Sequence, residues 1–126
     1  MFKLQSPIQT GEFIAALSTS ANNTTDWTNL TSADFKNTVN GLSVPAGQAF
    51  GEVSVYNPGL NDAFIKLRAR TVAGDTTASE LRILAGGSLS LNVLGLKAGS
   101  VETISYKKGA AGDDLFFTCS FFRSEI

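Results

Sequence analysis

Two stretches in the middle of the chain alternate apolar and polar residues as half-buried β-strands do. They span residues 50–57 and 63–70. One side of each stretch is apolar or glycine and is expected to face a core; these positions are Gly51, Val53, Val55, Ala63, Ile65, Leu67 and Ala69. The alternation predicts two strands, and we expect them to pair as a hairpin.

The segment that joins these strands, residues 56–62, consists largely of turn-forming residues. Pro58 fixes φ at one turn position, and Gly59 tolerates a positive φ at the next. Asn61 and Asp62 can bond to their own backbone. The chain is therefore expected to reverse direction here.

Two further connections, residues 85–87 and 109–112, each contain two glycines. Neither has the spacing or the Lys-Ser/Thr pair of a phosphate-binding loop, and no helix pattern follows either of them. We interpret both as hairpin connections in which glycine supplies the required positive φ.

Short apolar runs recur along the rest of the second half at intervals of roughly 8–12 residues. They predict further strands at residues 42–44, 81–84, 88–93, 101–106 and 114–123. Residues 72–79 are expected to be a connection, and residues 32–39 a short helix capped by Ser32. The pattern indicates an all-β fold, an antiparallel β-sandwich that is jelly-roll-like and has a loop-rich N-terminal segment.

The last expected strand has apolar residues on both of its sides. One side consists of Leu115, Phe117, Cys119 and Phe121, and the other of Phe116, Thr118, Ser120 and Phe122. A strand of an isolated sandwich needs only one apolar face. Either this strand is covered on both sides within the domain, or its second side meets another subunit.

A chain of 126 residues and 13.3 kDa has the size of one domain. Its apolar share of 43% against 17% charged residues is that of a globular protein rather than a disordered one. We expect residues 42–126 to form the sandwich core. Residues 1–41 are weakly patterned and polar, and we expect an N-terminal arm and polar loop region packed on the core or extending from it.

Charge and cysteine content restrict the partners and the compartment. The net charge is −1, with 10 basic and 11 acidic residues spread along the chain, so we expect neither nucleic-acid binding nor polybasic attachment to a membrane. Cys119 is the only cysteine, which excludes an internal disulfide and favours synthesis in a reducing cytoplasm. The apolar run at residues 13–17 is too short for a signal peptide or a membrane span.

Residues that carry chemistry are scarce. The absence of histidine excludes Ser-His-Asp and Cys-His machinery and the common zinc sites. Asp113 and Asp114 are adjacent in a glycine-containing loop, and we interpret them as solvated turn residues. Cys119 lies in an apolar row, which predicts a buried, unreactive thiol. We therefore expect no enzyme activity, no metal and no cofactor.

Trp27, the only tryptophan, lies in a polar segment rich in Asn and Thr. Its ring is expected to pin this loop to the core, to anchor a neighbouring subunit, or to stack on a sugar. Together with Phe116 and Phe122 of the last strand, and with Phe2 and Leu4 of the N-terminal arm, it makes up the set of candidate interface residues.

The turn and strand layout resembles that of small virion proteins of tailed bacteriophages, of the capsid decoration (cement) or head-spike type. The matching segments, which lie within residues 50–122, are VSVYNPGLNDAFIKL, ILAGGSLSL and ISYKKGAAGDDLFFTCSFF. The resemblance implies binding to a preformed capsid lattice, frequently as a homotrimer at a local three-fold axis, and no cofactor. It carries over no individual site residue.

The sequence therefore leads to a structural virion protein as the first functional hypothesis. Such a protein would be made in the host cytoplasm, bind the major capsid protein and copies of itself, and stabilise contacts at the capsid surface. The alternative is a glycan- or receptor-binding module of a phage fibre or spike, in which Trp27 and Tyr56 would contact the ligand.

Overall fold

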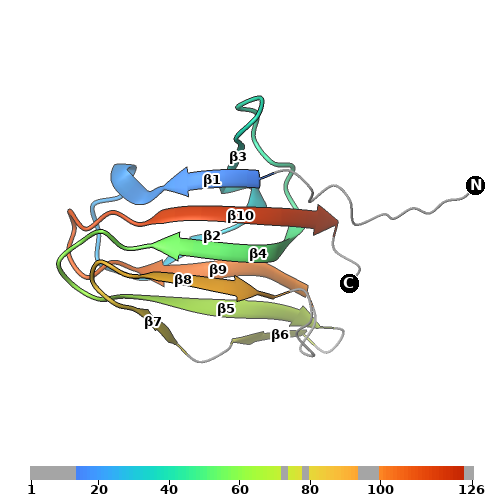
Figure 1. The fold of residues 1–126 in the computed structure, drawn as a ribbon. Helices are drawn as coiled ribbons and strands as arrows, with labels where there is room; N and C mark the ends of the chain where they lie inside the picture. Colours follow the sequence, from blue (N-terminus) through green and yellow to red (C-terminus); the bar gives the residue numbers. More distant parts are fainter. Residues whose placement is uncertain (1–13, 72–73, 78–79, 94–99, 124–126) are drawn as a thin grey trace, which may run out of the picture.

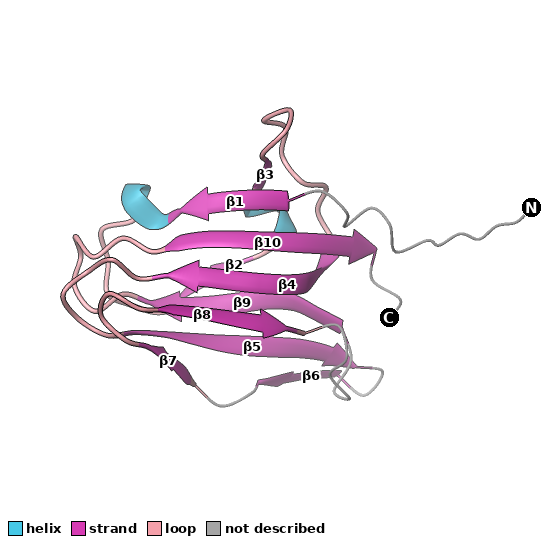
Figure 2. Ribbon diagram, in the orientation of Figure 1, coloured by secondary structure: helices cyan, strands magenta, loops and turns pink. Residues whose placement is uncertain are grey.

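The computed structural model describes residues 14–71, 74–77, 80–93 and 100–123, which form two antiparallel β-sheets (Figures 1 and 2). The first sheet has the order β3-β1-β10-β4-β8 and comprises β1 (Ile14–Ser18), β3 (Lys36–Asn37), β4 (Gln48–Tyr56), β8 (Ser88–Asn92) and β10 (Phe116–Arg123). The second has the order β2-β9-β5-β6, with β7 also paired to β5, and comprises β2 (Thr28–Leu30), β5 (Ala63–Thr71), β6 (Gly74–Thr77), β7 (Leu81–Ile83) and β9 (Ser100–Lys107). The prediction of an all-β, antiparallel fold is confirmed.

The two sheets face each other across one apolar core, to which both contribute. The alternation predicted for β4 and β5 is confirmed, because Val53, Val55 and Ile65 are at most 1% exposed. Glu52 and Ser54, which alternate with the valines, face solvent. The apolar side of each strand therefore lies between the sheets, and the polar side forms an outer face of the molecule.

Phenylalanine rings fill one part of this core. The ring of Phe35 meets the rings of Phe50 and Phe121 at centroid distances of 5.7 and 5.1 Å, and that of Phe117 at 6.3 Å, all edge to face. Such pairs contribute about 0.5–1.5 kcal/mol each beyond the area they bury. Phe35 thereby fixes the segment before β3 against the first sheet.

The helix expected over residues 32–39 is wrong. The chain makes only one 3-10 turn, η3 (Ser32–Asp34), and then continues into β3. Ser32 does not cap a helix: its hydroxyl donates to the carbonyl of Pro45 (2.7 Å) and accepts from the backbone N–H of Gln48 (3.2 Å). These bonds and the buried ring of Phe35 hold the segment extended, whereas Val39 is 86% exposed.

The first 41 residues contribute to both sheets. Their described part includes β1 and β3 in the first sheet, β2 in the second, and the 3-10 turn η2 (Thr19–Ala21). β1 pairs with β10 from Ile14 opposite Ser120 to Ser18 opposite Phe116. Further along the chain, the connection expected over residues 72–79 is wrong at residues 74–77, because these form β6 on the end of β5.

The hairpin predicted from β4 and β5 is wrong, because the two strands lie in different sheets. β4 pairs with β10 and β8, whereas β5 pairs with β9, β6 and β7. The turn residues between them carry the chain across the core rather than back along the same sheet. A two-residue period specifies which side of a strand is buried, but it contains no information on which strands pair with each other.

Three connections between the sheets meet at one end of the molecule, on the left in Figure 1. They are the β4–β5, β7–β8 and β9–β10 connections, residues 57–62, 84–87 and 108–115. Each joins strands of different sheets, so the interpretation of residues 85–87 and 109–112 as hairpin connections is wrong. We call this region the crossover end. Hydrogen bonds between the three connections make it a single packed unit.

Asn57 joins two of these connections. Its fully buried amide donates to the carbonyls of Asn61 (2.9 Å) and Ile83 (3.2 Å), and its side-chain oxygen accepts from the N–H of Gly59 (3.0 Å). Its backbone N–H donates to the carbonyl of Gly87 (2.8 Å). The side chain thus satisfies polar groups that the crossing would otherwise leave buried without partners.

Glycines at the crossover end serve mainly to let the connections approach each other. A Cβ on Gly109 would lie 2.5 Å from the carbonyl oxygen of Asp62, and a Cβ on Gly59 would lie 2.5 Å from Cγ of Asp113. Neither glycine has a positive φ, so that part of the prediction is wrong; it is confirmed only at Gly86, where φ is +74°.

Lys108 is buried at the same end, with a side chain that is 0% exposed. Its ammonium group donates to the carbonyls of Asn22 (2.6 Å) and Thr19 (3.4 Å) and pairs with the carboxylate of Asp114 (2.9 Å). Asp114 is therefore part of a structural ion pair, and its interpretation as a solvated turn residue is wrong. Lys108 ties η2 to the start of β10.

Candidate interaction face

Much of the outer side of the first sheet carries small polar residues and two aromatic rings. The part of it considered as a candidate contact surface comprises nine outward residues of β10, β4 and β8: Phe116, Thr118, Ser120, Tyr56, Ser54, Glu52, Ser88, Ser90 and Asn92. All of them are exposed except Ser120, which is half-buried. We call this surface the hydroxyl face.

Strand register sets the order of residues across the hydroxyl face. Thr118 lies opposite Ser54, which lies opposite Ser90, so one row across the sheet carries only hydroxyls. The neighbouring row joins Phe116 to Tyr56. Their rings are 45% and 49% exposed and stand at the edge of the hydroxyl row.

A β-bulge shapes the other end of this surface. The register between β4 and β10 shifts between Cys119 and Phe121, and the backbone N–H of Glu52 is satisfied by the hydroxyl of Ser120 (2.9 Å). Bulges bend a strand and redirect its side chains. Here the Glu52 side chain is directed outward, beside that of Asn92 on β8.

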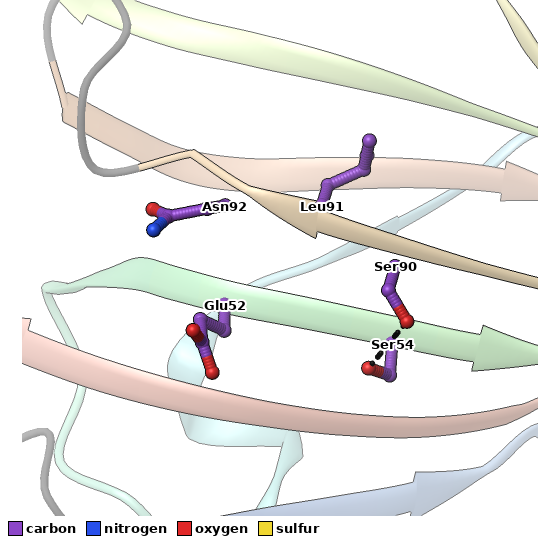
Figure 3. Close-up of a pocket in the computed structure, with 5 residues that line it drawn as sticks. All are labelled: Glu52, Ser54, Ser90, Leu91 and Asn92. Carbon is purple, nitrogen blue, oxygen red and sulfur yellow. Dashed lines mark hydrogen bonds between the residues drawn. The ribbon is translucent and has the colours of Figure 1, made fainter.

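A shallow depression of about 330 Å³ lies over β4 and β8 (Figure 3). Glu52, Ser54, Ser90 and Asn92 line it, and the hydroxyls of the two serines are 3.1 Å apart. Leu91 also contributes, although its side chain points the other way and packs on the core. The depression offers a carboxylate, an amide and two hydroxyls on a rigid sheet.

The hydroxyl face is nearly free of charge. Glu52 is its only ionisable side chain apart from the phenol of Tyr56. Side chains as short as serine let another surface approach the backbone closely, and few charges need to be desolvated when it does. These properties suit contact with another protein surface.

The outer side of β10 bears on the two alternatives left open for the last strand. Phe117 and Cys119 on the inner side are 1% and 2% exposed. Phe116 and Thr118 on the outer side remain exposed in the part of the chain that the structure describes, and Phe122 is half-buried. Cover by the same domain therefore does not extend to Phe116 and Thr118.

The candidate interface residues do not form one cluster. Phe116 and Phe122 lie on the outer side of the first sheet, whereas Trp27 lies against the outer side of the second. The ammonium group of Lys66 is 4.0 Å from the centroid of the Trp27 ring, and Trp27 is not part of the apolar core. Phe2 and Leu4 lie outside the described residues.

Sequence reasoning missed the serines at the centre of the hydroxyl face. Ser54 and Ser90 were recognisable as outward positions of their strands, but a single serine carries no signal of a site. Their adjacency depends on the pairing of β4 with β8, which are separated by β5, β6 and β7 in the chain. Only the sheet order brings the hydroxyls together.

Cys119 is buried as predicted, between β1 and β4 in the first sheet. Burial raises the pKa of its thiol from 9.0 to about 12, and a backbone hydrogen bond with Ser54 acts in the opposite direction. A neutral, enclosed thiol is a poor nucleophile and a poor metal ligand. Cys119 therefore acts as a small apolar residue of the core.

The raised pKa makes stability depend on pH above 9. Below that pH the thiol is protonated in both states, and above it the unfolded chain loses the proton while the folded chain retains it up to about 12. We expect unfolding free energy to fall by up to about 1.4 kcal/mol per pH unit in this window because of Cys119. Denaturant titrations between pH 8 and pH 11 should show a flatter pH dependence for Cys119→Ala; parallel curves would contradict the assignment.

Among the residues that the structure describes, no group of three or more His, Cys, Asp or Glu side chains is placed to hold a metal ion. In the same residues, no helix has the length and apolar character needed to cross a membrane.

No known protein family matches the sequence, and no curated protein sequence matches it.

Proposed function

We propose that this protein is a structural component of a virion, of the capsid decoration or cement type. It binds the surface of the assembled capsid, contacts the major capsid protein and copies of itself as a homotrimer, and stabilises the contacts between capsid subunits. It is made in the host cytoplasm and resides on the capsid surface.

The hydroxyl face carries this proposal. Protein interfaces are depleted of charge at their centres and enriched in Tyr and Phe. The hydroxyl face has one carboxylate, Glu52, and two exposed rings, Phe116 and Tyr56. Many copies bound through such a face to a symmetric lattice gain avidity, so each single contact can be weak.

The strand order supports a jelly-roll topology for the sandwich. One sheet contains β1, β10, β4 and β8 in that order, and the other contains β2, β9, β5 and β7. The pairs β1–β2, β4–β5, β7–β8 and β9–β10 each consist of strands in opposite sheets. Two sheets wound in this way characterise jelly rolls, an architecture common in viral capsid and lectin domains.

Sedimentation tests the proposal directly. We expect the purified protein to sediment as a trimer and to co-sediment with capsids assembled without it. Ser54→Arg places a long charged side chain at the centre of the hydroxyl face and should abolish co-sedimentation. Ala111→Arg, at an exposed position of the β9–β10 connection, introduces the same side chain elsewhere and should leave it intact.

Two results would contradict this assignment. A strictly monomeric protein that does not sediment with such capsids would remove the proposed function. Capsid binding that survives Ser54→Arg, with the fold intact by circular dichroism, would remove the hydroxyl face as the contact surface.

A glycan-binding module is the second candidate, and the depression in Figure 3 is the observation that favours it. Glu52, Asn92 and the two serines offer the carboxylate, amide and hydroxyl groups that bind sugar hydroxyls, and Tyr56 supplies an aromatic ring on the same face. Retention on host polysaccharide that Glu52→Gln and Tyr56→Ala both abolish would support this function. Equal retention of both variants would exclude the depression as the glycan site.

A further inference from the structure

The outer side of the second sheet gathers basic residues that are far apart in the sequence. Lys66 and Arg68 on β5 alternate with the buried Ile65 and Leu67, so both point outward. Lys107 on β9 and Arg82 on β7 lie on either side of β5 and are exposed. We call this surface, Lys66, Arg68, Arg82 and Lys107 together with Trp27, the cationic face.

The pairing register makes the cationic face two-dimensional. Phe64 of β5 lies opposite both Lys107 of β9 and Arg82 of β7, so these two cations are separated by two strand spacings, about 9–10 Å. Lys66 and Arg68 are two residues apart along β5, about 7 Å. Four positive charges thus cover an area across three strands rather than one line.

Among the residues that the structure describes, most of these cations form no ion pair with a carboxylate. The guanidinium group of Arg82 lies 3.6 Å from the carboxylate of Asp62. This ion pair is largely exposed to solvent, so Asp62 offsets the positive charge of Arg82 only weakly. Within the described ranges, Lys66, Arg68 and Lys107 form no ion pair with any carboxylate, and the exposed Asp26 beside Trp27 pairs with none of them.

Trp27 holds two of the lysines in place. The ammonium groups of Lys66 and Lys107 lie 4.0 and 5.9 Å from the centroid of its ring. The negative face of an indole attracts ammonium groups and partly offsets the repulsion between them. The charges are therefore positioned before any partner arrives.

The overall composition of the chain gives no indication of a cationic surface. The net charge is −1, and the hydroxyl face on the opposite sheet carries no cation. The strand alternation sends Lys66, Arg68 and Lys107 to one side of the molecule, whereas the neighbouring Lys108 points inward and is buried. The protein is thus polarised between its two outer faces.

We propose that the cationic face is a second docking surface and that its partner is a carboxylate-rich surface of another protein. Charge complementarity calls for an anionic partner. Lys66 occupies one side of the Trp27 ring, which blocks stacking of a nucleobase or sugar there. Carboxylates need no stacking platform, because they bind ammonium and guanidinium groups directly. This inference does not depend on the proposed capsid function.

Poly-L-glutamate serves as the probe for such a surface. We expect the full chain to bind it at low ionic strength by calorimetry, and to lose the binding as salt approaches physiological concentrations. Trp27 is the only tryptophan, so its fluorescence reports whether the ligand sits at this face. A shift in Trp27 emission should saturate together with the calorimetric signal.

Charge-removal variants locate the binding. The triple variant Lys66→Gln, Arg68→Gln, Lys107→Gln is expected to bind poly-L-glutamate about tenfold more weakly. The loss is no larger because each exposed ion pair with the ligand contributes modestly. Lys107→Gln alone should weaken it by about twofold to fivefold. Lys36→Gln removes one exposed charge from β3 in the other sheet and should change the affinity less than twofold.

Three outcomes would overturn the inference. One is no binding of poly-L-glutamate at low salt by a protein whose fold is intact. Another is an equal effect of Lys36→Gln and Lys107→Gln on the affinity, which would show that binding depends on net charge and not on the cationic face. The third is tighter binding of oligo-dT or polygalacturonate of matched charge, which would replace a protein partner with a nucleic acid or an acidic polysaccharide.

Discussion

Replacing Lys108 with methionine is expected to lower the free energy of unfolding by about 3–5 kcal/mol, as removal of one partner of a buried ion pair does. The methionine fills similar space, but it leaves the carbonyls of Asn22 and Thr19 and the carboxylate of Asp114 without their donor. Urea denaturation followed by Trp27 fluorescence measures the loss.

The adjacent lysine provides the matched control. Lys107→Met removes the same charge from an exposed position one residue earlier and should cost less than about 1 kcal/mol. Combining Lys108→Met with Asp114→Asn should cost less than the sum of the single changes, since the two groups are coupled. Equal losses for Lys107→Met and Lys108→Met would refute the structural role of the buried amine.

Gly109→Ala is expected to destabilise the protein by about 2–3 kcal/mol through overpacking. The added methyl would lie 2.5 Å from Cβ of Asn61 and from the carbonyl oxygen of Asp62. Neither neighbour can move easily. Asn61 donates two hydrogen bonds to the carboxylate of Asp113, and the carboxylate of Asp62 accepts a hydrogen bond from the N–H of Ala85.

A second glycine in the same connection separates this packing effect from a change in backbone entropy. A methyl group added at Gly112 would have no neighbouring atom within 4 Å, and Gly112 does not have a positive φ. Gly112→Ala should therefore change the free energy of unfolding by less than about 0.5 kcal/mol. A thermal or urea midpoint that falls equally in both variants would contradict the close-approach explanation.

The alternation of apolar and polar residues predicted which side chains are buried, but it did not predict which strands pair. Val53 and Ile65 were placed correctly in the core, because burial depends on a local two-residue period. The β4–β5 hairpin was wrong because Asn57 anchors the turn across the core, and its partners Ile83 and Gly87 lie more than twenty residues away along the chain.

Polar residues were harder to interpret than apolar ones. Asp113 and Asp114 look like solvent-exposed loop residues in sequence, yet Asp113 accepts from both the backbone and the side-chain N–H groups of Asn61, and Asp114 pairs with Lys108. A buried lysine is rare and is stable only with partners. Those partners are brought together by the crossing of the connections, which no local pattern records.

The sequence identified single residues of the two candidate surfaces but not the surfaces themselves. The sequence singled out Phe116 because a strand with two apolar sides is unusual, and the structure leaves its ring 45% exposed. It did not reveal the serine row beside that ring or the cluster of cations on the other sheet. Both surfaces depend on strand order across a sheet, a property of the assembled fold.

The central position of β10 has a consequence for synthesis on the ribosome. This strand fills the gap between β1 and β4, although residues 19–115 separate it from β1 along the chain. Until residue 123 has left the exit tunnel, β1 and β4 lack the strand that pairs with both of them. Their apolar sides and unpaired backbone N–H and C=O groups stay accessible to other nascent chains. Crowded polysomes should therefore be the stage at which this polypeptide depends most on chaperones.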